Sequence, residues 1–163
     1  MAGLNPAIHA VTPAGSLLIW VEEMEIQRLA GVSQLLVSER EFVALHSCLN
    51  EVCNLPLIKD DGDFERWIGV KRDSVGTLFS LFPENRWHGT VWGSGESGLL
   101  IKVGHDGGFR IELSDANLRV VRNCLYETCN WIRLYEFQTR IGIELEDALA
   151  MLRLMTNAIK LAN

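Results

Sequence analysis

The chain has 163 residues, of which 48% are hydrophobic and 22% are charged, which excludes a wholly disordered or fibrous protein. Its 15 lysine and arginine residues against 21 aspartate and glutamate residues give a net charge of −6, which argues against binding to a nucleic-acid backbone. The length is typical of one domain, so we expect residues 1–163 to form a single domain.

The N-terminal part of the chain carries no recognisable targeting signal. Its apolar run at residues 17–21 is too short to cross a membrane, and no basic residue precedes it. Since nothing marks the chain for export, its four cysteines are expected to be reduced thiols. We therefore expect a cytoplasmic protein that does not contact a membrane.

The chain repeats itself in order along its length. Residues 17–21 align with 99–103, and residues 38–54 align with 114–130. Farther on, three residues of the first copy recur in the second: Phe64, Ile68 and Gly69 recur as Phe137, Ile141 and Gly142. Such an ordered series predicts an internal duplication. Unit one covers residues 16–82, unit two covers 98–160, and residues 83–97 connect them.

The first unit is expected to begin with strands at 17–25 and 34–37, both rich in β-forming residues. Ser38 and Glu41 form a capping box, which predicts a helix that ends at Asn54. Asn tolerates the left-handed conformation expected at such an end. A short helical turn then leads to Gly69, and a further helix covers 71–81.

The second unit predicts the same elements. Strands at 99–103 and 109–113 flank a glycine-rich turn, and Ser114 begins a helix that ends at Asn130. A last helix covers 144–161, with an apolar stripe at helical spacing. Its expected members are Leu145, Leu149, Leu152, Met155 and Ile159.

Each unit therefore reads strand–strand–helix–helix, and the fold class is α+β. The two hairpins are expected to form one four-stranded antiparallel sheet, with helices packed on one face and a pseudo-two-fold axis between the copies. A larger sheet results if residues 86–92 add a strand.

The cysteines occur as two C-x4-C pairs, Cys48 with Cys53 and Cys124 with Cys129. A four-thiolate zinc site is disfavoured, because residues five apart on a helix point about 140° away from each other. We interpret these cysteines as small core residues and expect no metal and no cofactor.

Three further groups are candidates for binding. Glu51 and Glu127 occupy matching helix positions and form either a ligand site on the pseudo-two-fold axis or ordinary surface charges. Asp60, Asp61 and Asp63 form an acidic loop, either a solvated turn or a patch that faces a basic partner. Trp87, His88 and Trp92 in the connecting segment form either a binding hot spot or a cover over the open face of the sheet.

The second unit carries N-C-L-Y-E-T-C-N at residues 123–130 and E-F-Q-T-R-I-G at residues 136–142. It resembles small bacterial proteins of unassigned function that carry N-x-L-x-E-x-x-N followed by E-F-x-x-R-hydrophobic-G. The resemblance implies a bacterial or phage origin and transfers no catalytic residue. The first copy departs from this pattern, with Arg66 and Trp67 where the second has Thr139 and Arg140.

These observations favour a non-enzymatic protein-binding domain. An acidic, aromatic-bearing immunity-type inhibitor of a basic toxin or effector has this profile. Two alternatives stay open: a small-molecule enzyme or ligand sensor with its site on the pseudo-two-fold axis, and a self-assembling structural subunit that pairs through an exposed strand edge.

Overall fold

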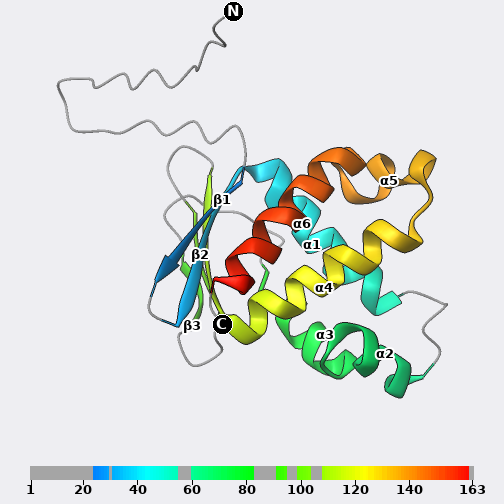
Figure 1. The fold of residues 1–163 in the computed structure, drawn as a ribbon, viewed down its shortest axis with the longest axis horizontal. Helices are drawn as coiled ribbons and strands as arrows, with labels where there is room; N and C mark the ends of the chain where they lie inside the picture. The colour runs from blue at the N-terminus through cyan, green and yellow to red at the C-terminus, as the bar shows by residue number, and fades with distance from the viewer. Residues whose placement is uncertain are drawn as a thin grey trace, which may run out of the picture.

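The computed structural model describes residues 24–29, 31–54, 60–82, 91–94, 99–103 and 108–161. Within these ranges the chain forms five strands and six helices (Figure 1). The strands are β1 (Glu25–Leu29), β2 (Val32–Val37), β3 (Val91–Ser94), β4 (Leu99–Val103) and β5 (Phe109–Ser114). The helices are α1 (Glu39–Asn54), α2 (Asp61–Ile68), α3 (Arg72–Ser80), α4 (Asp115–Trp131), α5 (Leu134–Ile141) and α6 (Leu145–Lys160).

The strands form one antiparallel sheet in the order β1-β2-β5-β4-β3. β2 and β5 come from opposite halves of the chain and pair at its centre, where Leu35 lies opposite Ile111. β3 adds a fifth strand to the four that the two hairpins predict. The sheet therefore joins the two halves.

The fold class predicted from the sequence is confirmed: the protein is α+β, and its helices pack on one side of the sheet (Figure 1). Side chains of β5 alternate between the two sides, so that Phe109, Ile111 and Leu113 are buried while Arg110 is exposed. Such alternation is expected of an antiparallel sheet with one face on the core. α1 and α4 pack against each other and, at their N-terminal ends, against the central strands.

The starts of α1 and α4 follow from local hydrogen bonds. The Ser38 amide donates to Glu41 Oε2 at 2.8 Å, and the Glu41 amide donates to Ser38 Oγ at 3.3 Å, which confirms the capping box. The hydroxyl of Ser114 accepts from the amide of Asn117 at 3.2 Å. Each cap satisfies amides at the helix start that have no intrahelical partner.

The two halves contain the same elements in the same order, namely β1-β2-α1-α2-α3 and β4-β5-α4-α5-α6. The packing is also reciprocal, because the short helix of each half packs on the long helix of the other: α2 on α4, and α5 on α1. A common origin of the halves stays a prediction from the sequence.

The first hairpin lies later in the chain than predicted. β1 shares only Glu25 with the predicted strand at 17–25, and residues 17–23 lie outside the described residues. Leu29 pairs with Val32 across a two-residue loop that contains Gly31, whose φ is +74°. Glycine adopts this conformation readily, so Gly31 was the turn signal that sequence reasoning missed.

The short helical turns predicted before Gly69 and Gly142 are the eight-residue helices α2 and α5. Both glycines have left-handed backbones, with φ of +90° and +92°. The same role predicted for Asn54 and Asn130 was wrong, because no described non-glycine residue has positive φ. The two asparagines lie within the last turns of α1 and α4 instead.

The predicted stripe of α6 is confirmed in part, because Met155 is buried and Leu145, Leu152 and Ile159 are partly buried against the core. The buried residues of α6 are Ala148, Met151, Met155 and Ala158, whereas Leu149 is exposed. α6 packs on α4.

Among the described residues, no helix combines the length and apolarity that a membrane crossing requires.

Candidate functional site

Of the three residues predicted as a binding hot spot, the structure describes only the backbone of Trp92. Trp87 and His88 lie outside the described residues. Trp92 lies on β3, where its backbone pairs with that of Ile101, and the structure does not describe its side chain. These three residues stay predictions.

The acidic stretch is not the loop that the sequence predicted, because it forms the start of α2. Asp60 is the N-cap, and its Oδ1 accepts from the amide of Asp63 at 2.7 Å. Asp63 pairs with Arg66 at 3.1 Å, and Asp61 lies 3.6 Å from Arg72. Carboxylates favour the start of a helix, whose free amides carry partial positive charge. All three aspartates therefore have local partners, although Asp61 remains 82% exposed.

Glu51 and Glu127 have separate partners. Glu51 on α1 binds the guanidinium of Arg140 on α5 through both of its oxygens. Glu127 on α4 accepts a hydrogen bond from Nε1 of Trp131 at 2.7 Å. No hydrogen bond or ion pair links the two glutamates to a common group among the described residues. A ligand site shared by them on the pseudo-two-fold axis stays a prediction.

The four cysteines lie on the mutually packed helices α1 and α4. Cys48 and Cys124 are buried, and Cys53 and Cys129 are partly buried. Burial raises the pKa of all four thiols and places the pKa of Cys129 at about 11, because a thiolate is poorly solvated there. Thiols of this kind are weak nucleophiles at neutral pH.

The strongest candidate site was missed by sequence reasoning and is built from two stacked indoles. Trp67 on α2 and Trp131 at the C-terminal end of α4 have ring centroids 5.4 Å apart and ring planes 16° apart. Trp131 is 39% exposed, and Glu127 is fixed at its edge by the hydrogen bond to Nε1. We call Trp67, Trp131 and Glu127 the indole site.

The indole site exists because α2 packs on α4. Asn123 of α4 donates through Nδ2 to the carbonyl of Ile68 at 3.0 Å, which fixes the C-terminal end of α2 against α4. Residue 131 lies on the same side of α4 as residues 123 and 127, because four residues span about one helical turn. Trp67 therefore meets Trp131 beside Glu127.

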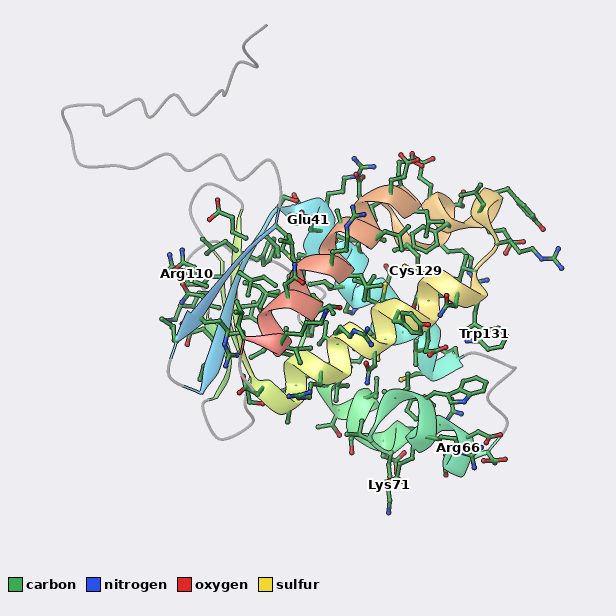
Figure 2. The ribbon with its side chains drawn as sticks, viewed as in Figure 1. Glu41, Arg66, Lys71, Arg110, Cys129 and Trp131 are labelled. Carbon is green, nitrogen blue, oxygen red and sulfur yellow. The ribbon has the colours of Figure 1, made fainter. Side chains whose placement is uncertain are left out.

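The site lies at the end of the helical layer remote from the sheet. Figure 2 shows Trp131 at this end, with Arg66 of α2 nearby and Arg110 of the sheet on the opposite side of the molecule. Two further side chains with apolar surface are exposed a few residues beyond Trp131 in the chain: Leu134 and Tyr135 at the start of α5 are 73% and 71% exposed. Exposed aromatic and apolar residues of this density are typical of a binding surface.

One signal in the sequence bears on this site. Trp67 replaces Arg140 at the matching position of the repeat, two residues before the helix-ending glycine. The neighbouring residues also differ between the halves, so only the tertiary structure, which places Trp131 beside Trp67, identifies the site.

Among the described residues, no group of three or more histidine, cysteine, aspartate or glutamate side chains is arranged to hold a metal ion. No family model, curated protein or solved structure matches the chain.

Proposed function

We propose that this chain is a non-enzymatic, cytoplasmic protein-binding domain, an immunity-type inhibitor that captures a basic toxin or effector through the indole site. The observation that carries the proposal is the stacked indole pair Trp67–Trp131, exposed at one end of the molecule beside the carboxylate of Glu127. Tryptophan is enriched among residues that dominate binding energy, because it buries a large area with little loss of side-chain freedom.

The surroundings of the indole site support a protein partner. Leu134 and Tyr135, a few residues beyond Trp131 in the chain, are two further large side chains that are exposed. Asp61 at the start of the same short helix as Trp67 is 82% exposed and supplies negative charge, although Arg72 lies 3.6 Å away. With a net charge of −6, the chain attracts a basic protein over long range and disfavours a nucleic acid as the partner.

The surroundings of the buried thiols and of Glu51 support binding rather than chemistry. Burial raises the pKa of Cys48 and Cys124, so neither is poised as a thiolate nucleophile. Glu51 is held in an ion pair with Arg140. The two thiols pack in the core and Glu51 forms an ion pair, so we assign each of these groups a structural role.

The test is capture of partners from the source cell by the full chain, compared with variants of the indole site. We expect one basic protein in stoichiometric amount, lost with Trp131→Ala and reduced as salt rises. Leu149→Ala, which removes a 38% exposed apolar side chain from α6, serves as the matched control and should retain the partner. Thermal melts of both variants show whether folding is preserved.

The purified partner then decides the inhibitory role. One equivalent of the chain should abolish the partner's activity, and the Trp131→Ala variant should require a large excess. If wild type, Trp131→Ala and Leu149→Ala capture the same proteins, the indole site is not the interface and the proposal is wrong.

A further inference from the structure

The two halves of the chain place a glutamate at the same helix position but give it different neighbours. Glu51 and Glu127 each precede a cysteine by two residues, on α1 and α4. A short helix packs on each of these long helices, α5 on α1 and α2 on α4, and each short helix ends at a left-handed glycine. The residue two positions before that glycine lies near the end of the long helix that carries the glutamate. That residue is Arg140 opposite Glu51, and it is Trp67 in the other half.

The first of these glutamates shows how the position binds a cation. Nε of Arg140 donates to Oε1 of Glu51 at 3.2 Å, and Nη2 donates to Oε2. The planar guanidinium thus engages both carboxylate oxygens, an arrangement that an ammonium group cannot reproduce. This helix position presents its carboxylate to an arginine approaching from the side of the short helix.

Among the described residues, no arginine or lysine pairs with the second glutamate in this way. Oε2 of Glu127 accepts from Trp131, and Oε1 has no hydrogen-bond or ion-pair partner among the described residues. Where the other half has arginine, this half has the indole of Trp67, stacked on Trp131. Trp131 is 39% exposed.

We propose that the indole site receives an arginine side chain of the partner protein, which takes the role at Glu127 that Arg140 takes at Glu51. The guanidinium stacks on the exposed indole and donates to the unpaired oxygen of Glu127. Arginine is favoured over lysine because its plane stacks on aromatic rings and its fork matches a carboxylate. This inference rests on the proposed function and specifies the chemistry that the site recognises.

The test uses the full chain, labelled with ¹⁵N, and two capped peptides, hexa-arginine and hexa-lysine, at equal ionic strength. The indole signal of Trp131, assigned with Trp131→Phe, should shift with hexa-arginine. We expect hexa-arginine to bind at least about threefold more tightly than hexa-lysine. Glu127→Gln should weaken hexa-arginine binding by about threefold to tenfold.

Two control variants separate the site from general acidity. Glu146→Gln removes the same charge from an exposed position on α6 and should change hexa-arginine binding by less than about twofold. Trp67→Arg supplies a guanidinium from within the chain, as Arg140 does for Glu51, and should abolish the preference for hexa-arginine. A thermal melt shows whether Trp67→Arg is folded. If this variant is unfolded, Glu127→Gln still tests the inference.

Equal affinity for the two peptides, or equal effects of Glu127→Gln and Glu146→Gln, would overturn the inference in favour of general attraction to acidic surface. A captured partner whose binding is unchanged by Glu127→Gln would also overturn it, while leaving the proposed function intact. If capture finds no partner but hexa-arginine still binds preferentially at Trp131, the proposed function fails and the recognition chemistry stands.

Discussion

Arg140 on α5 binds Glu51 on α1 with both carboxylate oxygens, although 89 residues separate them in the sequence. A second contact supports the same packing, because Nε of Arg40 donates to the carbonyl of Gly142 at 3.1 Å. The short helix of the second half is thereby attached at two points to the long helix of the first. The pair connects the halves on the helical side, as β2 and β5 connect them in the sheet.

Breaking this pair should destabilise the fold modestly. The side chains of Arg140 and Glu51 are 41% and 16% exposed, so solvent screens the pair only in part. We expect Glu51→Gln and Arg140→Gln each to lower the free energy of unfolding by about 1 kcal/mol, with a coupling of about 0.5 kcal/mol in the double-mutant cycle. Urea denaturation of the four proteins measures this coupling. Glu136→Gln is the control, since its i,i+4 contact with Arg140 is longer, at 3.6 Å. Zero coupling between Glu51 and Arg140 would contradict the prediction.

The glycines that end α2 and α5 should respond alike to substitution, and a third glycine should respond in the opposite direction. Gly69 and Gly142 have φ of +90° and +92°, and an added Cβ meets no atom closer than 3.8 Å, so the cost of alanine is backbone strain. We expect each alanine variant to lose about 1 kcal/mol. Gly76→Ala, within α3 and with open space at the Cβ, should gain up to about 1 kcal/mol. Thermal or urea unfolding measures all three, and a gain at Gly69 would be inconsistent with its left-handed backbone.

Acid should remove a stabilising contact between β1 and the start of α4. Arg28 donates to Asp115 at 2.5 Å, and this hydrogen bond lowers the pKa of Asp115 below its usual value. Because the folded pKa is the lower one, the contribution is complete above the unfolded pKa, near 3.8, and is lost as pH falls through the folded pKa. Asp115→Asn should therefore be less stable than wild type at pH 7, by less than about 1 kcal/mol since the pair is partly exposed.

The Asp115 prediction is checked by urea denaturation of wild type and Asp115→Asn from pH 7 to pH 2. The difference in stability should stay constant down to about pH 5 and shrink below about pH 4. A difference that grows on acidification would have the wrong sign. Asp73→Asn, which alters an exposed carboxylate in the first turn of α3, provides the control for helix-start charge.

The thiols should react slowly and in order of exposure. Burial raises the pKa of the partly buried Cys129 to about 11, so little thiolate is present at pH 8. Cys48 and Cys124 are fully buried, and burial raises their pKa as well. With iodoacetamide at pH 8, peptide mapping should show Cys53 and Cys129 modified first, and Cys48 and Cys124 only after addition of urea. Rapid modification of Cys48 in the native protein would contradict the packing of α1 on α4.

The elements that the sequence determined are those specified by neighbouring residues. The capping box of Ser38 and Glu41 begins α1, and the glycine-rich segment between β4 and β5 is flanked by the strands it predicts. Apolar spacing also identified the buried residue Met155 of α6. Each of these features depends on hydrogen bonds or periodicity within a few residues, which the local sequence records.

The tertiary structure decided which side chains meet across the fold. Glu51 and Glu127 occupy matching positions, yet only Glu51 binds an arginine of the facing helix, because the residue two positions before the helix-ending glycine is Arg140 on α5 and Trp67 on α2. The stacking of Trp67 on Trp131 likewise depends on α2 packing against α4. Contacts of this kind join residues far apart in the chain, so no local pattern encodes them, and the candidate site emerges only when the helices pack.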